Sequence, residues 1–136
     1  MPNTITTNST ATLIEKKSKF IANLYKITTE QEAIDIIKST KKEHHKATHN
    51  VYAYTIIQDG QTISRYSDDK EPKGTAGRPI LFLLNQNNLC NTLAIVTRYF
   101  GGTLLGKGGL IRAYTKSVKL ALEKTEIIEL IQRDFN

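Results

Sequence analysis

The chain has little cysteine, no long apolar run, and no charge in its first twelve residues. Its one cysteine, Cys90, has no partner for an internal disulfide, so the sequence fits a reducing compartment and predicts a cytoplasmic protein. No stretch approaches the roughly 18 apolar residues of a membrane-spanning helix, and residues 1–12 do not resemble a secretory signal. We therefore expect no membrane partner and no disulfide framework.

What the chain does have is enough apolar sequence for one domain of ordinary size. Of its 136 residues, 39% are hydrophobic, so a core can form without disulfides or structural metals. The net charge of +6 is moderate, and a basic protein need not bind nucleic acid. The distribution says more, because the segment 98–124 carries six Lys or Arg residues and one acid, Glu123.

Local patterns predict five strands and three helices in the order ββαββαβα. The strands are expected over 11–16, 20–26, 51–58, 61–66 and 92–99, with a hairpin turn at Asp59-Gly60. The helices are expected over about 29–42, 77–87 and 107–124. The last helix is expected to be amphipathic, with one basic face and one apolar face; the basic face has Arg112, Lys116 and Lys119, and the apolar face has Leu110, Tyr114, Val118 and Leu122. This order predicts the α+β class, with a mixed sheet and helices over one face. Residues 125–136 alternate weakly, as a further strand would. We divide the chain into a domain over 1–124 and a tail over 125–136.

The densest functional signal is a glycine-rich loop between the last strand and the last helix. Five of the eight glycines lie from Gly101 to Gly109, where they permit positive φ and close backbone approach. The following helix start offers free N–H groups, so the loop suits the phosphate of a nucleotide or a nucleic acid. Alternatively, the glycines only make a tight connection. The residues assigned to phosphate are Arg98, Gly101, Gly102, Gly106, Lys107, Gly108, Arg112 and Lys116.

The same loop nearly matches a nucleotide-binding P-loop. The stretch from Gly101 to Lys107 has the spacing G-x-x-x-x-G-K, but Gly108 stands where the magnesium-binding Ser or Thr is needed. No apolar run elsewhere ends in the aspartate that would complete the metal site. The sequence therefore argues against hydrolysis of nucleoside triphosphates, and we assign no cofactor and no catalytic residue.

A second loop, over 67–79, gathers three carboxylates. Asp68, Asp69 and Glu71 lie within four positions directly after a strand, with Arg78 near the far end of the loop. Grouped carboxylates can hold a divalent metal or transfer protons. Asp and Pro in a polar loop are also ordinary turn formers. The sequence leaves both interpretations of this acidic loop open.

The two loops are expected to meet at one side of the sheet. Each follows a strand and precedes a helix, and ligand crevices form where the carboxyl ends of strands gather. Carboxylates of the acidic loop would then orient Arg98 or Arg112 through charged hydrogen bonds. His45 and His49 have helical spacing, but no Cys or Glu completes a zinc site, so we assign no metal ligand.

Three ordered motifs resemble the YigZ/IMPACT family. They occupy residues 47–54, 68–79 and 98–114, with Ser18-Lys19-Phe20-Ile21-Ala22 upstream, so the resemblance covers about residues 17–124. Two positions depart from the family pattern. Lys70 stands where the family often has Gly, and Val51 stands where it often has Cys, which argues against shared thiol chemistry.

The resemblance implies the amino-terminal domain of that family. It implies an α+β fold like the second domain of small-subunit ribosomal protein S-five and domain IV of elongation factor G. Eukaryotic members regulate translation by competing for the activator of a kinase that phosphorylates an initiation factor. Bacterial members lack a settled activity, and their domain is suspected of binding nucleic acid. They usually continue into a small ferredoxin-like domain, of which residues 125–136 would be the start.

Residues and resemblance together favour a non-catalytic module that binds RNA or a ribosomal surface through the glycine loop and the basic helix. One alternative is an enzyme in which Asp68, Asp69 and Glu71 hold a metal beside a phosphate. Another is a regulator of translational control that binds a protein partner, which requires an exposed apolar patch.

Overall fold

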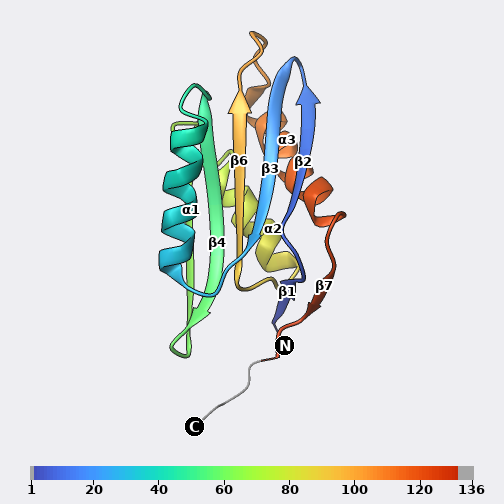
Figure 1. The fold of residues 1–136 in the computed structure, drawn as a ribbon. Coiled ribbons are helices and arrows are strands. Elements are labelled where there is room, and N and C mark those ends of the chain that lie inside the picture. The colour runs from blue at the N-terminus through green and yellow to red at the C-terminus, as the bar shows by residue number, and fades with distance from the viewer. Residues whose placement is uncertain (1, 132–136) are drawn as a thin grey trace.

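The computed structural model of this protein describes residues 2–131 and has one five-stranded sheet with helices packed against it (Figure 1). Across the sheet the strands are β2 (Ser9–Glu15), β3 (Ser18–Lys26), β6 (Thr92–Tyr99), β4 (His49–Gln58) and β5 (Gln61–Ser67). The helices are α1 (Glu30–Glu43), α2 (Gly77–Gln86) and α3 (Gly106–Leu122). The α+β class is confirmed, and the eight expected elements occur in the expected order. Within residues 2–131, every helix is too short or too polar to cross a bilayer.

The sheet is antiparallel throughout, which corrects the expectation of a mixed sheet. β3 and β4 run in the same direction, but β6 lies between them and pairs antiparallel with both. The crossover through α1 therefore leaves a gap one strand wide, which a later strand fills. A strand–helix–strand order along the chain suggests parallel neighbours, and it does not reveal that a third strand separates them.

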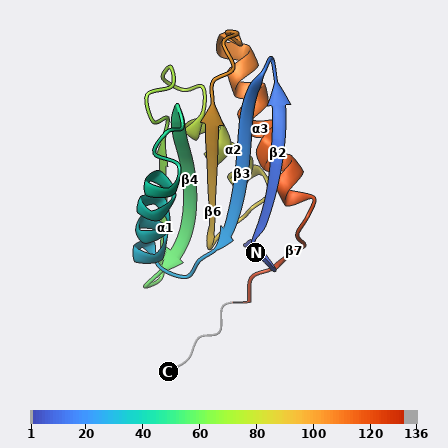
Figure 2. The same cartoon turned by 45° about the horizontal axis from the view of Figure 1, so that its top comes forward.

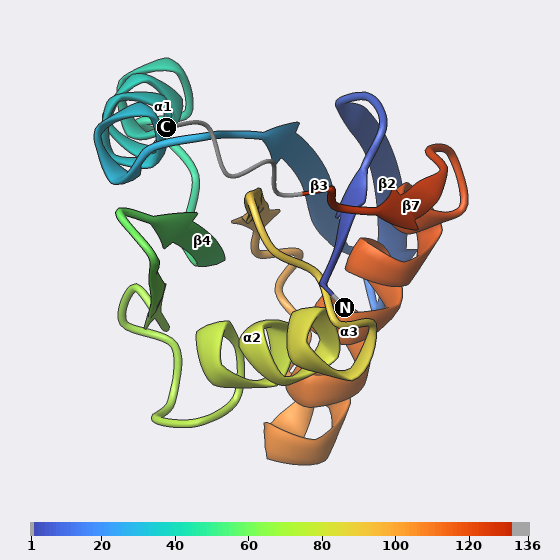
Figure 3. The same cartoon turned by 90° about the horizontal axis from the view of Figure 1, so that it is seen from below.

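Helices cover both faces of the sheet, which corrects the expectation of one covered face. α2 and α3 lie against one face and α1 against the other (Figure 3). In β6, Ala94 and Val96 pack in the cluster with α2 and α3, whereas Leu93 and Ile95 pack in the cluster with α1. Because successive residues of a strand point to opposite faces, an unbroken apolar run such as residues 93–96 needs cover on both sides.

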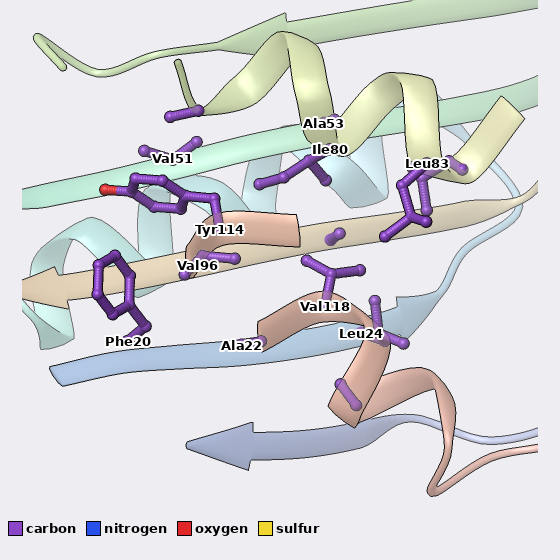
Figure 4. Packing of buried hydrophobic residues seen from close by; sticks show 14 of the residues in the cluster. Phe20, Ala22, Leu24, Val51, Ala53, Ile80, Leu83, Val96, Tyr114 and Val118 are labelled. Atoms are coloured by element: carbon purple, nitrogen blue, oxygen red, sulfur yellow. The ribbon is translucent and has the colours of Figure 1, made fainter. Parts of the chain in front are cut away.

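The larger core lies between the sheet and the helices α2 and α3 (Figure 4). The expected amphipathic pattern of α3 is confirmed, since Tyr114 and Val118 are buried while Arg112 and Lys116 are exposed. The ring of Tyr114 packs edge-on against Phe20 of β3, with ring centroids 5.0 Å apart. This aromatic pair holds the middle of α3 against the sheet.

A second, two-stranded sheet brings the two ends of the described chain together. β1 (Asn3–Ile5) pairs antiparallel with β7 (Ile127–Glu129). The further strand expected in the tail is therefore present, and its partner is a segment for which the sequence predicted no strand. Residues 132–136 of the expected tail lie outside the described residues. The division between a domain over 1–124 and a tail remains a prediction.

The turn between β2 and β3 and the glycine loop are in direct backbone contact. A Cβ atom added at Gly101 would overlap the backbone carbonyl group of Lys17. The Gly101 N–H also donates to Ser18 Oγ, at 3.2 Å. Close packing therefore requires glycine at 101, whereas a positive φ of 77° favours it at Gly106, where α3 begins.

We expect Gly101→Ala to lower the free energy of unfolding by at least about 2 kcal/mol, because the added methyl group must displace the hairpin backbone. Gly108→Ala is the matched control. Its Cβ would meet the movable guanidinium of Arg112 at 3.2 Å, and Ala suits a helix better than Gly does. Urea unfolding would measure both variants, and equal stabilities would contradict the close contact at Gly101.

Candidate functional site

The acidic loop and the glycine loop meet at the same end of the sheet, as expected (Figure 2). β5 and β6 both run antiparallel to β4, so the carboxyl ends of β5 and β6 lie at the same end of the sheet. β5 leads into residues 68–76 and β6 into residues 100–105. Both loops contribute walls to a cleft of about 430 Å³, with Glu71 from the first and Leu104 from the second.

A buried ion pair joins the two loops at this cleft. Arg98 Nη1 donates to Glu71 Oε2 at 2.8 Å, and the two residues are only 5% and 7% exposed. The Arg98 guanidinium also donates to Ser18 Oγ, at 3.2 and 3.4 Å. It lies over the rings of Phe20 and Phe100, 5.4 and 5.5 Å from their centroids. The expected orientation of Arg98 by a carboxylate of the acidic loop is therefore present.

Two further side chains complete the surroundings of Glu71. Tyr114 of α3 donates its hydroxyl to Glu71 Oε2, and His49 Nε2 lies 3.3 Å from Glu71 Oε1. His49 Nδ1 lies 2.8 Å from the carbonyl oxygen of Asp69, and since a carbonyl only accepts, Nδ1 is the donor. Burial, with the Glu71 carboxylate beside it, raises the pKa of Tyr114, so the phenol keeps its proton and remains a donor.

The other two carboxylates of the acidic loop accept hydrogen bonds from the backbone. Asp68 accepts from the N–H groups of Gly74, Ala76 and Gly77, at 2.8 to 3.2 Å, which ties the end of the loop to the first residue of α2. Asp69 Oδ2 accepts from the N–H of Asn50 at 2.6 Å. These bonds fit the turn-forming interpretation, and residues 2–131 contain no group of three His, Cys, Asp or Glu placed to hold a metal ion. Arg78 is exposed on the first turn of α2.

The residues expected to bind phosphate fall into two groups. Arg98 is buried and paired with Glu71, so its guanidinium does not face the solvent as a phosphate contact would. The exposed members are Gly102, Gly106, Lys107, Gly108, Arg112 and Lys116, whereas Gly101 is half-buried against the hairpin. α3 begins without a side-chain cap, which leaves the N–H groups of its first turn available to an anion.

The β2–β3 hairpin adds lysines that the sequence did not indicate as part of the site. Lys16 and Lys17 are exposed, and the contact between the hairpin and Gly101 places them beside the glycine loop. Lys16 lines a second cleft, of about 240 Å³, together with Arg112 and Lys116 of α3. The hairpin and the glycine loop are 83 residues apart where Ser18 bonds Gly101, so no local pattern could join them.

His49 and Tyr114 are also parts of the site that sequence reasoning missed. Both stand within the motifs that carry the family resemblance, which was the available signal. A motif shows that a residue type recurs at a position, but not which atom it contacts. Only the packing of β4 and α3 on the acidic loop reveals that both side chains face Glu71.

Several acidic side chains lie at the opposite end of the molecule from the cleft. They belong to the start of α1, the turn between β4 and β5, and the segment around β7 (Figure 1). These acids are Glu30, Glu32, Asp59, Glu126 and Glu129. At the end that holds the two clefts, the exposed Lys16, Arg112 and Lys116 line the smaller cleft together with Glu15.

A match to a known family covers nearly all of this site. The Impact N-terminal domain family model matches residues 16–122. The chain belongs to this family. The matched range includes the turn between β2 and β3, β3 itself, both loops and α3, whereas β2, with Glu15 of the smaller cleft, precedes it. The resemblance seen in the three sequence motifs is thereby confirmed.

The relatives include bacterial and eukaryotic proteins. "IMPACT family member YvyE" of Bacillus subtilis is 49% identical over 117 residues, which cover 86% of this chain and 54% of that protein. "IMPACT family member YigZ" of Escherichia coli is 40% identical over 111 residues, covering 80% and 54%. The "Protein IMPACT homolog" of Dictyostelium discoideum is 40% identical over 95 residues, covering 68% and 27%. The chain thus spans about half the length of the bacterial relatives.

Two solved structures share the fold. A crystal structure of a hypothetical protein superposes with a TM-score of 0.86 at 34% identity, covering 94% of this chain and 64% of that chain. The two-domain translational regulator Yih1 superposes with a TM-score of 0.51 at 24% identity, covering 90% and 46%. The second similarity concerns the fold alone.

We expect Glu71→Gln to lower the free energy of unfolding by about 3 kcal/mol, because the buried Arg98 guanidinium loses its counter-charge. Glu123→Gln, which changes an exposed acid at the end of α3, is the matched control and should shift stability by less than about 0.5 kcal/mol. Urea denaturation at neutral pH compares the two. A loss in Glu71→Gln no larger than in the control would be inconsistent with the buried ion pair.

The raised pKa of Tyr114 predicts that the free energy of unfolding depends on pH. Its raised folded-state pKa means that the folded protein keeps a proton which the unfolded chain loses near pH 10. The stabilisation is therefore complete below about pH 10 and declines as the pH rises further. Between about pH 9 and pH 11, Tyr114→Phe should lose less stability than the wild type. Tyr66→Phe, at an exposed tyrosine, should follow the wild type, and identical profiles for all three proteins would rule out this role.

Proposed function

We propose that this protein is an RNA-binding module that holds phosphates at the cationic end of its sheet. The observation that supports this most is the meeting of three basic elements there, namely the β2–β3 hairpin, the glycine loop and the exposed face of α3. Lys16 comes from the hairpin and Arg112 from the helix, yet both line one cleft. Cations gathered from separate elements attract a polyanion through release of its counterions.

Exposed side chains and backbone have different roles in this proposal. Lys107, Arg112 and Lys116 contact phosphates, and Lys16 does so from the other side of the smaller cleft. The glycines allow an RNA strand to approach the protein backbone at the start of α3. Arg98 is a positioning residue, because it holds the acidic loop through Glu71. Phosphate contacts carry no sequence information, so we expect little preference between RNA sequences.

The proposal extends to a role in translational control, with ribosomal RNA or another RNA of the translation machinery as the ligand. Its support is membership of the family, in which the sequence resemblance implies translation regulators among the eukaryotic members. The chain spans about half the length of its bacterial relatives. The activity of the whole protein is therefore part of the same proposal, and so are its location in the cytoplasm and its binding of any protein partner.

The RNA-binding proposal is tested by the salt dependence of affinity. Anisotropy of a labelled single-stranded RNA of about 12 nucleotides would be measured between about 50 and 200 mM salt. Replacing Lys107, Arg112 and Lys116 together with Ala should weaken binding. It should also flatten the slope of log affinity against log salt by about 2, because each lost contact on a single strand removes about 0.7.

The matched control removes the same charge elsewhere. Lys26, Lys38 and Lys124 are exposed and lie outside the residues that line the two clefts. Their combined replacement by Ala lowers the net charge equally and should leave most of the affinity and the slope in place. If the wild type does not bind RNA at about 50 mM salt, or if both triple variants lose affinity alike, the proposed RNA-binding surface is wrong.

A further inference from the structure

The cleft of about 430 Å³ between the two loops differs in character from the cationic surface around it. Its size falls in the range of about 300 to 1,000 Å³ that is usual for ligand sites, which are mostly apolar with a few polar groups. The exposed Lys70 and Lys107 belong to its lining. The apolar members of the lining are Pro72, Phe100, Leu104, Leu105 and Leu110.

The cleft presents an aromatic ring that is uncovered and yet held in place. Phe100 is 46% exposed, although the Arg98 guanidinium lies over its ring at 5.5 Å. Its backbone N–H donates to Thr48 Oγ1 at 2.9 Å, and Glu71 in turn holds Arg98 at 2.8 Å. One face of the ring therefore rests on a buried cation. A fixed aromatic ring with open surface is a platform on which a flat ligand can stack.

A second apolar side chain beside the ring is left almost wholly in water. Leu104 is 81% exposed and lines the same cleft as Phe100. Apolar side chains that are exposed together and rimmed by polar residues mark binding sites more often than isolated ones do. Two such side chains facing one cleft, with Lys70 and Lys107 beside them, indicate a ligand that is apolar in part and anionic in part.

The polar groups at the floor of the cleft are engaged with one another. Glu71 accepts from Arg98 and Tyr114, and His49 faces its other oxygen. Thr48 Oγ1 accepts from the Phe100 N–H. The cleft therefore offers a stacking surface and nearby cations, and its floor is not arranged to read the hydrogen-bonding edge of a ligand.

We propose that this cleft holds one unstacked base of a single-stranded RNA, with Phe100 as the stacking surface and Lys70 and Lys107 at the adjoining phosphates. The inference rests on the proposed function, since the same cationic end must hold the strand. A base has apolar faces and is flanked by phosphates on both sides, which matches an apolar cleft with two lysines at its lining. An apolar side chain of a partner protein would pack against the apolar walls of the cleft, but it would leave Lys70 and Lys107 without counter-charge.

The proposal predicts that single-stranded RNA and duplex RNA bind differently. Bases of a duplex stay stacked in its interior, so a duplex reaches the exposed cations but cannot fill the cleft. It also predicts that the bases and the phosphate backbone contribute separately to affinity. An abasic oligonucleotide of the same length keeps the phosphates and loses what stacks on Phe100. Stacking tolerates every base, so binding should still depend little on sequence.

The first experiment compares Phe100→Ala with the wild type by anisotropy. We expect single-stranded RNA to bind the variant about 5- to 100-fold more weakly, with an unchanged salt slope, and the abasic oligonucleotide to bind both proteins alike. Phe82→Ala is the matched control, because Phe82 is 63% exposed on α2 and lies outside the cleft. Phe100→Tyr keeps the ring and should bind as the wild type does, which shows whether the ring or a local misfolding causes the loss.

The second experiment uses the absence of tryptophan from this chain. Phe100→Trp introduces a single tryptophan into the cleft, and stacking of a base on it should quench its emission. The abasic oligonucleotide should leave that emission unchanged. Phe82→Trp reports from the surface of α2 and should respond to neither ligand.

The outcomes distinguish this inference from the function on which it rests. If the wild type binds neither oligonucleotide, RNA binding fails and the base site fails with it. If the wild type binds both oligonucleotides equally, and Phe100→Ala binds like Phe82→Ala, the base site is overturned while phosphate binding stands. If saturating RNA leaves the emission of Phe100→Trp unchanged, no base stacks at this position in the complex, and the base site is overturned.

Discussion

The buried contact between Glu71 and Arg98 is the interaction on which the functional end of this protein depends. It joins the loop after β5 to β6, and Tyr114, His49 and Ser18 connect it to α3, β4 and β3. Two charges removed from water are tolerated only when each has enough partners. Here the carboxylate accepts from two donors, and the guanidinium bonds two side chains and lies over two aromatic rings.

The contribution of this pair is one of position more than of stability. Apolar residues of similar volume often stabilise a core as well as a buried ion pair does. If the floor were apolar, however, a shift of the acidic loop along β6 would cost little free energy. In this protein a shift of Glu71 would leave a buried guanidinium without its counter-charge. The same guanidinium lies over Phe100, so the register of the acidic loop also sets the aromatic side of the larger cleft.

Burial divides the cations of this end into two kinds with different physical effects. Arg98 is surrounded by protein and acts on its neighbours through short contacts that salt screens much less than exposed ones. Lys107, Arg112 and Lys116 are exposed and act on a polyanion through counterion release, which salt weakens steeply. In the proposed function the first kind shapes the site and the second supplies its affinity. Glycine at 101 allows both kinds to lie together, because it lets the lysine hairpin approach the loop.

Sequence alone determined the features that depend on neighbours along the chain. The turn at Asp59-Gly60, the amphipathic pattern of α3 and the strand before each loop follow from local preferences, and they sufficed to predict that the two loops meet. Only the tertiary structure decided that β6 lies between β3 and β4, that α1 covers the far face, and that Arg98 is buried while Lys16 joins the site. These outcomes depend on which distant segments pair and pack, and a residue's type does not encode its partner across 80 positions of chain, the separation of Arg98 and Ser18.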